Sequence, residues 1–241
     1  MVVWVFSGGG EAEVRGLIPL LEKIFSNCKF ERKTPARKKP GPKPGKGSSY
    51  GRTGQSLIEQ ISKELPIALR YEPNKCNLIL VFDDLDCRTP EVQEKKILDA
   101  ILIIPECVDI QIFVGFAAPE LEAWIIADWS NSIARHPDFK GRHERMRYWL
   151  SQEKNIPFNE PESFSEYDED RDCCREKLSK TLVDSSVLAE FDSRSTRYSK
   201  GLHTPALLQD IRPEEVQRKC PLFRQLYNYL NNFCRSPSNY G

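Results

Sequence analysis

The residues best suited to chemistry in this sequence are carboxylates that follow short apolar runs. Asp84-Leu85-Asp86 comes after NLILVF. Its two aspartates are separated by one residue and therefore point to the same side of an extended backbone. Glu11 comes after VVWVF and the turn Ser7-Gly8-Gly9-Gly10, whose glycines let the backbone approach a ligand closely. Carboxylate oxygens are ligands that Mg²⁺ and Mn²⁺ favour. We therefore predict a divalent-cation site at Glu11, Asp84 and Asp86.

A third acidic segment is ELEAWIIAD, which has the pattern of a helix and ends near Asp128. On a helix, Glu120 and Glu122 lie about 200° apart, so only one of them can face the predicted site. Glu122 is favoured because Trp124 and Ile125 are apolar neighbours, and Glu120 is the better candidate for a capping acid. Structural explanations also remain open for the other acids, since aspartates cap helices and a glutamate in a first turn is favourable.

The glycine-rich segments do not match known nucleotide-binding loops. GGGEAEVRG departs from GxGxxG at Glu13, and a carboxylate there would repel a pyrophosphate from the helix N-terminus. The segment from Gly41 to Ser48 is one residue shorter than a Walker A loop, and Gly47 replaces the magnesium-binding Ser or Thr. NLILVFDD resembles a Walker B strand but has no partner loop, so the sequence does not indicate an ATPase.

Strand and helix patterns alternate over residues 1–128. We expect strands near 2–6, 28–33, 77–82 and 109–116, and helices near 11–26, 55–70, 90–103 and 117–128. Crossover connections of this kind favour a mostly parallel sheet with helices on both faces, and ligands bind at the carboxyl ends of its strands. The fold class is therefore predicted to be α/β and Rossmann-like.

The second half of the chain shows no strand pattern of similar quality. Helical patterns occur near residues 144–152, 172–182 and 222–233, and the acidic segment 159–172 is expected to be a solvated linker. We predict a C-terminal helical lobe over residues 129–241 that packs on the α/β domain. His136, His143 and His203 lack metal-ligand spacing among themselves, and only His203 is close in sequence to another candidate, Lys200.

A basic loop at residues 34–54 interrupts the first domain and is rich in Pro, Gly and Lys. Lys and Arg neutralise nucleic-acid phosphates without reading sequence, although a solvated linker has the same composition. The candidate nucleic-acid-binding residues in and beside this loop are Arg32, Lys33, Arg37, Lys38, Lys39, Lys43, Lys46 and Arg52.

The remaining composition favours a cytoplasmic protein. No run approaches the roughly 20 apolar residues of a membrane helix, and the N-terminus lacks the basic region of a signal peptide. The eight cysteines form no CxxC motif. We expect reduced and mostly buried thiols, as in other proteins of a reducing compartment.

The ordered set of motifs resembles the Toprim pattern, in which a glycine turn with a glutamate precedes a strand that ends in DxD. The segments APELEAWIIAD and RYSKGLHTPALL resemble the Toprim-like family called domain of unknown function 4276, which is similar to the Toprim half of the overcoming-lysogenization-defect (OLD) nucleases. The resemblance spans residues 2–128 and 198–230. It implies a Toprim-like fold and phosphodiester cleavage that depends on Mg²⁺ or Mn²⁺.

The resemblance also implies roles for particular residues. Glu11 would be a catalytic acid and metal ligand, Asp84, Asp86 and Glu122 further metal ligands, and Lys200 the catalytic lysine that stabilises charge on the phosphate. Ser7 departs from the pattern, which has Glu at this position, and a serine supplies no negative charge. The candidates to replace that charge are Asp83, Glu13 and Glu120.

Two functions from different classes follow from the resemblance. The first is a metal-dependent nuclease that acts on DNA or RNA, in phage defence and beside an ATPase partner. The second is a catalytically degenerate Toprim module that binds nucleic acid or docks on such an ATPase, and Ser7 is the residue that favours it.

Overall fold

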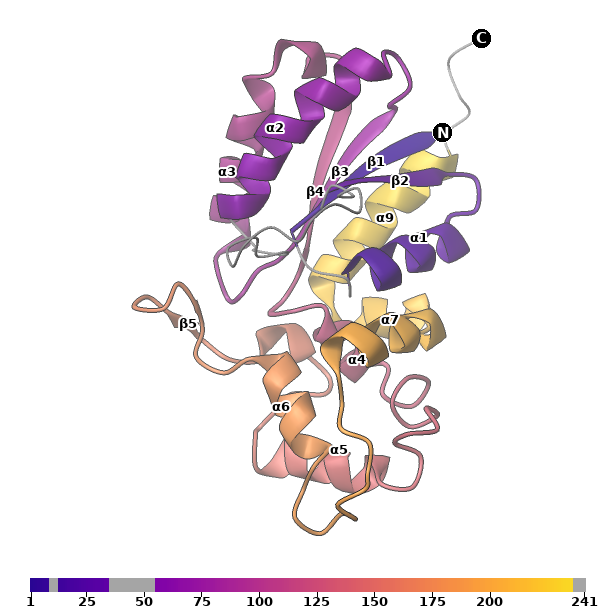
Figure 1. Ribbon diagram of the computed structural model, residues 1–241, viewed down its shortest axis with the longest axis vertical. Coiled ribbons are helices and arrows are strands. Elements are labelled where there is room, and N and C mark those ends of the chain that lie inside the picture. Colours follow the sequence, from indigo (N-terminus) through magenta and orange to yellow (C-terminus); the bar gives the residue numbers. More distant parts are fainter. Residues whose placement is uncertain (9–12, 35–54, 236–241) are drawn as a thin grey trace, which may run out of the picture. The chain divides into compact units, whose positions relative to one another are not determined.

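The computed structural model describes residues 1–8, 13–34 and 55–235, and it divides the chain into two compact units (Figure 1). Unit 1 comprises residues 1–83, 89–115 and 229–241, and unit 2 comprises residues 84–88 and 116–228. The chain passes between the units more than once. This division differs from the single boundary predicted at residue 128.

Unit 1 is built on a four-stranded parallel sheet in the order β2-β1-β3-β4. The strands are β1 (Val2–Ser7), β2 (Lys29–Thr34), β3 (Leu78–Asp84) and β4 (Gln111–Ala117). β1 pairs in parallel with both β2 and β3. β3 is buried along its whole length and β1 along almost all of it, as near-continuous apolar strands are in a parallel sheet covered by helices. The predicted α/β alternation is confirmed.

Helices flank this sheet (Figure 1). They are the π-helical turn η1 (Glu13–Leu17), α1 (Ile18–Ile24), α2 (Gln55–Tyr71), α3 (Pro90–Leu102), the short 3-10 turn η2 (Pro105–Cys107) and the C-terminal end of α9 (Pro221–Arg235). Pro90 starts α3 after Thr89, as predicted, because its fixed φ suits the first helical position and its missing N–H has no partner there.

Unit 2 is mostly helical and also contains a small hairpin. Its helices are α4 (Glu122–Ala127), α5 (His143–Gln152), the 3-10 turn η3 (Pro161–Ser163), α6 (Leu178–Ser185), α7 (Lys200–Asp210), α8 (Pro213–Lys219) and the N-terminal part of α9. Every residue of α4 is buried, and Trp124 packs edge-on against Phe223 with ring centroids 4.7 Å apart. α4 is therefore the core helix of unit 2.

The hairpin corrects the interpretation of residues 159–182. β5 (Tyr167–Asp168) pairs antiparallel with β6 (Cys173–Cys174), and α6 begins only at Leu178. Residues 159–172 are mostly exposed, as predicted, but they contain η3 and β5 and are not a plain linker. The predicted start of a helix at residue 172 is wrong. The sequence pattern over this segment suggested a helical period of 3.6 residues. The strands of the hairpin are too short to show the period of 2 residues that marks a strand.

Two disulfides correct the expectation of reduced thiols. Cys28 is bonded to Cys234 within unit 1, and Cys87 is bonded to Cys174 within unit 2. Cys76, Cys107, Cys173 and Cys220 are free. The pairs are 206 and 87 residues apart in sequence, so no short motif such as CxxC could reveal them.

The search for membrane-spanning segments covered the described residues. None of their helices combines the length and the apolar character needed to cross a bilayer.

Candidate cation site

The loop that follows β3 is held by the segment that follows β4. Within unit 2, the Leu85 amide donates to the Ala117 carbonyl and the Asp86 amide donates to the Pro119 carbonyl, both at 2.9 Å. Asp86 and Cys87 have φ values of 48° and 63°. Side chains with a Cβ rarely adopt this left-handed region, at a cost of about 1–3 kcal/mol each. Surrounding contacts therefore fix the conformation of this loop.

Three carboxylates of unit 2 converge on the ammonium group of Lys200, the first residue of α7. The Lys200 Nζ atom lies 3.4 Å from Asp84 Oδ2, 3.5 Å from Glu120 Oε1 and 3.3 Å from Glu122 Oε2. All three acids are buried, and Glu122 is 0% exposed. We call these four residues the carboxylate cluster. Among the contacts of the described residues, three acids thus share one ammonium group.

Fixed donors orient two of these acids. Asp84 Oδ1 accepts from the Leu121 amide at 3.0 Å. Glu120 accepts from the amide and the hydroxyl of Ser179, each at 2.9 Å, at the start of α6. Asp84 turns its other oxygen, Oδ2, toward Lys200, whereas Glu120 Oε1 accepts from the Ser179 hydroxyl and also lies near Lys200. These donors hold both side chains in place.

Glu122 is the most deeply buried member of the carboxylate cluster. Burial raises its pKa, nearby Lys200 lowers it and Glu120 raises it further. Its Oε1 atom accepts from the Thr204 hydroxyl at 2.8 Å, and Thr204 also contacts the Tyr198 hydroxyl at 2.7 Å. Burial raises the pKa of Tyr198 as well, so that phenol stays neutral. Among the described residues, Glu122 Oε2 has no hydrogen-bond donor, although it lies near Lys200 Nζ.

Glu120 joins the cluster because it precedes the helix. The expectation that only one of Glu120 and Glu122 could face the site assumed that both were helical. α4 begins at Glu122, with Leu121 as its N-cap, and a cis peptide bond joins Ala118 to Pro119. The periodicity of ELEAWIIAD does not show where its first turn begins. Glu120 was nevertheless among the predicted replacements for the charge that Ser7 lacks.

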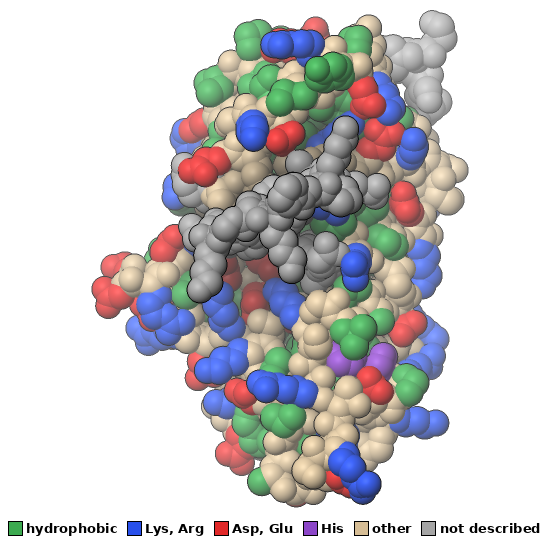
Figure 2. Space-filling model, in the orientation of Figure 1, with side chains coloured by type: hydrophobic (Ala, Val, Ile, Leu, Met, Phe, Trp, Pro, Cys, Tyr) green, Lys and Arg blue, Asp and Glu red, His purple; other side chains and the backbone are tan. Residues whose placement is uncertain are grey.

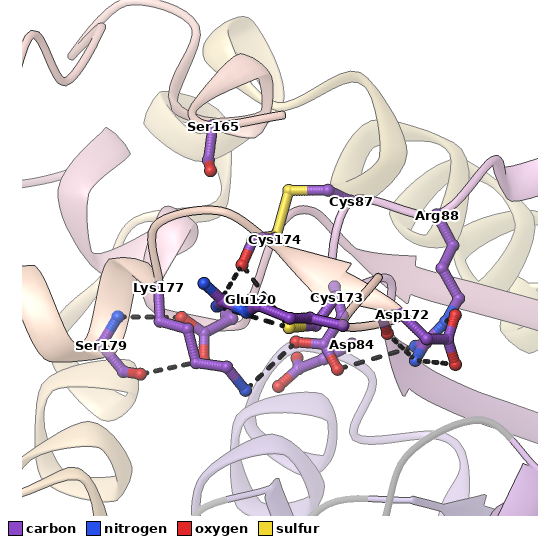
Figure 3. Close-up of polar contacts among 12 residues, drawn as sticks. Asp84, Cys87, Arg88, Glu120, Ser165, Asp172, Cys173, Cys174, Lys177 and Ser179 are labelled. Carbon is purple, nitrogen blue, oxygen red and sulfur yellow. Dashed lines mark hydrogen bonds and ion pairs between the residues drawn. A yellow bond between two sulfur atoms is a disulfide. The ribbon is translucent and has the colours of Figure 1, made fainter. Parts of the chain in front are cut away.

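Asp86 lies beside a different set of cations. Its Oδ2 atom is 3.6 Å from Arg88, and its Oδ1 atom is 3.9 Å from Lys177. Arg88 in turn donates to the Asp172 carboxylate at 3.1 Å and to its carbonyl at 2.6 Å (Figure 3). The DxD pair therefore divides. Asp84 belongs to the carboxylate cluster, and Asp86 faces the hairpin and the start of α6.

Several predicted site residues lie outside the described residues. These are Glu11 and, among the basic candidates, Arg37, Lys38, Lys39, Lys43, Lys46 and Arg52. Arg32 and Lys33 lie on β2, and Lys33 pairs with Glu72 at 2.7 Å and lies 4.1 Å from the Trp4 ring centroid. Lys33 therefore already has an acidic partner within unit 1.

The end of β1 is closely packed and hydrogen-bonded within unit 1. The Ser7 hydroxyl donates to the Thr34 carbonyl at 3.3 Å, and the Thr34 hydroxyl donates to the Ser7 carbonyl at 3.2 Å. A Cβ atom on Gly8 would lie 2.4 Å from Asp83 Oδ1, so only glycine fits beside that buried carboxylate. Ser7 thus has a structural role of its own, and the other predicted replacement, Glu13, lies in η1.

A second group with metal-ligating atoms consists of His136, Asp138 and His203. His203 Nδ1 accepts from the Ser199 amide at 2.7 Å, so its proton is on Nε2, which donates to Asp138 at 3.1 Å. A metal ligand needs a free lone pair, and both His203 nitrogens are already engaged. The ligand atoms of this group lie within 4.8 Å of one another, a spacing that, among the described residues, the three acids of the carboxylate cluster around Lys200 do not meet. Its weakness as a metal site is that both His203 nitrogens are engaged.

Unit 2 also has a pocket of about 370 Å³ beside α5, lined by residues that include Trp129, Arg147 and Tyr148. None of its lining residues belongs to the carboxylate cluster, so the pocket does not enter the argument for a cation. Comparisons of this chain with protein families, curated proteins and solved structures find no match.

Proposed function

We propose that this chain is a divalent-metal-dependent phosphodiesterase with a Toprim-like active site in unit 2, and that its substrate is nucleic acid. The observation that carries the proposal is the convergence of three buried carboxylates on one ammonium group, with contacts of 3.3–3.5 Å. Buried charges are costly unless they are paired or bound to metal, and the contacts of the described residues bring three acids to one ammonium group.

The donor set fits a hard cation. Asp84, Glu120 and Glu122 offer oxygen ligands, as Mg²⁺ and Mn²⁺ prefer, and Glu122 Oε2 has no hydrogen-bond donor among the described residues. A bound metal would supply Lewis-acid activation of water and neutralise the scissile phosphate. In that mechanism Lys200 stabilises negative charge on the phosphate. Asp86 stays in the proposal as a further acid of unit 2, and Glu11 stays an expectation from the sequence that lies outside the described residues.

The residues proposed to bind nucleic acid lie outside the carboxylate cluster. Acidic and basic side chains are mixed across the face in Figure 2, so the described residues there do not form a broad positive surface. The proposed phosphate contacts therefore rest on the basic loop at residues 34–54. The proposal also includes a cytoplasmic location and, as the Toprim resemblance implies, an ATPase partner in phage defence.

The test combines cleavage with metal binding. Wild-type protein, Asp84→Asn and the control Asp192→Asn are incubated with labelled single- and double-stranded DNA and RNA in Mn²⁺. Asp192 is exposed and pairs only with a neighbour, Arg194, in the described contacts. We expect at least a hundredfold loss of cleavage and a loss of calorimetric Mn²⁺ binding in Asp84→Asn alone. Equal cleavage by Asp84→Asn would contradict the assignment.

The degenerate-module alternative has its own support. Lys200 already contacts all three acids, so the cluster can also act as a salt bridge within unit 2, and Ser7 is engaged in a structural hydrogen bond. Nucleic-acid binding with no cleavage in Mg²⁺ or Mn²⁺, together with no calorimetric metal binding, would favour this alternative.

A further inference from the structure

The first turn of α7 carries Lys200 to the carboxylate cluster, yet it lacks the features that usually stabilise the start of a helix. Lys200 is the first residue of α7, where a positive charge opposes the helix dipole. Gly201 follows, and glycine has a low helix propensity. The N-cap residue Ser199 makes no side-chain capping bond, and the first turn contains no acidic residue. Contacts from elsewhere therefore matter for this turn.

His203 contacts both backbone polar groups of Ser199. The Ser199 amide donates to His203 Nδ1 at 2.7 Å, and the His203 amide donates to the Ser199 carbonyl at 2.8 Å. In a capping box, a side chain of the first turn accepts from the N-cap amide in the same way. The residue directly before Lys200 is thus held on its N–H and on its carbonyl by one histidine.

Asp138 fixes the form of the imidazole that can make this bond. A neutral imidazole has one donor nitrogen and one acceptor nitrogen. His203 Nε2 lies 3.1 Å from Asp138 Oδ2, so the proton is on Nε2 and the lone pair on Nδ1 faces the Ser199 amide. An imidazole with its proton on Nδ1 would instead place two donors opposite each other.

The imidazole ring is packed among other rings. His203 is 1% exposed, and its ring centroid lies 5.4 Å from that of Tyr198, 4.9 Å from that of Phe139 and 5.4 Å from that of His136. Tyr198 and His203 are stacked at an interplanar angle of 25°. This packing keeps the orientation in which Nδ1 reaches Ser199.

Contacts on either side of Ser199 have different targets. The amide and the hydroxyl of Tyr198 are hydrogen-bonded within unit 2, which fixes the residue before Ser199. Ion pairs hold the far end of the Lys200 side chain. Among the described contacts, the Ser199 amide has His203 Nδ1 as its acceptor. His203 therefore holds the backbone between these two fixed points.

We propose that His203 and Asp138 are positioning residues of the carboxylate cluster. Asp138 selects the Nε2–H form of His203, and that form holds the Ser199 amide. The fixed first turn of α7 then directs the Lys200 ammonium group to the three acids. Neither His203 nor Asp138 touches those acids in the described contacts, so both act through Lys200. The effect on cleavage rests on the function proposed above, and the effect on Lys200 does not.

The first test needs neither activity nor a destabilising variant. Nitrogen NMR of the full chain with isotope-labelled histidine distinguishes the protonated ring nitrogen of His203 from the unprotonated one. We expect a protonated Nε2 and an unprotonated Nδ1 at neutral pH. A protonated Nδ1 would overturn the proposal, because that nitrogen could not accept from Ser199.

Two variants separate the acceptor from the ring. His203→Asn places an amide oxygen near the position of Nδ1, whereas His203→Gln extends toward the position of Nε2. Both lose the ring and hence share the loss of packing. We expect hydrogen exchange at the Ser199 amide to be about tenfold faster in His203→Gln than in His203→Asn, as the loss of one hydrogen bond implies. Equal exchange in the two variants would overturn the role of Nδ1.

A double-mutant cycle shows whether this bond acts on Lys200. In urea unfolding, a positioning role predicts that His203→Gln costs less when Lys200→Met is already present. We expect the unfolding constants of this pair to depart from additivity by about fivefold, and those of His203→Asn with Lys200→Met to be additive. Additivity in both pairs would make His203 a purely structural residue and overturn the proposal.

The last test separates this inference from the proposed function. If wild type cleaves nucleic acid in Mn²⁺, His203→Gln should lower kcat about tenfold and leave KM unchanged, because Lys200 acts on charge that develops in the transition state. His203→Asn should keep most of the activity. Equal kcat in wild type and His203→Gln would refute positioning and leave the proposed function standing. No cleavage by wild type would refute the proposed function, and the unfolding cycle would then support or overturn the positioning of Lys200.

Discussion

The sheet of unit 1 and the carboxylate cluster of unit 2 bury polar groups in opposite ways. At the end of β1, Ser7 and Thr34 exchange hydrogen bonds with each other's carbonyl groups, so neutral donors meet neutral acceptors. In unit 2, three buried acids share the ammonium group of Lys200. The first arrangement is complete in itself. The second gathers three acids on one ammonium group in the described contacts, and this convergence is the basis of the cation site proposed for unit 2.

The largest expected effect comes from removing that ammonium group. Lys200→Met leaves three carboxylates without their shared partner. Because the Lys200 side chain is 34% exposed, we expect a loss toward the lower end of the roughly 3–5 kcal/mol that breaking a fully buried pair costs. The control is Lys95→Met on α3 of unit 1, which removes an exposed pair with Asp99 and should change the free energy of unfolding by less than about 0.5 kcal/mol.

Urea unfolding of both variants, without metal and with Mn²⁺, measures this contrast. We expect Mn²⁺ to restore part of the stability lost in Lys200→Met, because the metal replaces the missing positive charge. If Lys200→Met loses as little unfolding free energy as Lys95→Met, the three acids are not charged together. The contrast between the neutral hydrogen bonds of unit 1 and the charged cluster of unit 2 would then be refuted.

A smaller effect is expected at the end of β1. Gly8→Ala places a Cβ atom 2.4 Å from Asp83 Oδ1, and overpacking of this kind costs about 1–3 kcal/mol. Gly141→Ala is the matched control, since nothing lies within 4 Å of its Cβ position. Thermal unfolding should separate the two variants clearly. Equal melting temperatures would mean that Asp83 moves aside freely.

The hydroxyl that holds Glu122 tests whether that acid is charged. Thr204→Val keeps the shape of the side chain but removes the donor to Glu122 Oε1, and it is compared in a Tyr198→Phe background because the same hydroxyl bonds Tyr198. A hydrogen bond to a charged group contributes about 1.5–3 kcal/mol. Thr181→Val removes a buried hydroxyl that donates to the neutral Lys177 carbonyl, for which about 0.5–1.5 kcal/mol is expected. Equal losses in chemical denaturation would indicate that Glu122 is neutral in this protein.

The sequence predicts the sheet of unit 1 better than it predicts the carboxylate cluster of unit 2. The strands of the sheet follow from apolar runs such as NLILVF, because a covered parallel strand must be apolar on both faces. Asp84, Glu122 and Lys200 were candidates, and the structure brings them together. Their meeting depends on distant segments, since Lys200 is 116 residues from Asp84, and no local pattern shows such a contact.

The features of the carboxylate cluster and the hairpin that the sequence did not predict have physical causes. Glu120 was expected to point away because its helical position was assumed, and the true start of α4 at Glu122 removes that constraint. Ser179 and Thr204, which hold two of the acids, have no signature in a single sequence. The hairpin of β5 and β6 has two residues per strand, too few for a periodicity to appear.

A half-buried acid of unit 2 sharpens the comparison because no cation neutralises it at the same close range in the described contacts. Glu162 accepts from the backbone amides of Leu222 and Phe223 at the start of α9. Burial nevertheless raises its pKa to about 7. The folded protein therefore holds a proton that the unfolded chain releases near pH 4.5, so Glu162 makes the free energy of unfolding fall as pH rises from about 4.5 to 7.

Glu162→Gln should remove that slope, because a neutral amide oxygen still accepts from both amides. We expect the variant to gain about 2–3 kcal/mol relative to wild type between pH 5 and pH 8, because the folded and unfolded pKa values of Glu162 differ by more than two units. Urea unfolding at closely spaced pH values measures it. If wild type and variant keep parallel profiles, Glu162 is ionised throughout, and the two backbone amides alone compensate for its burial. That outcome would show that unit 2 can bury a charge without a cation, which would weaken the inference that the carboxylate cluster needs one.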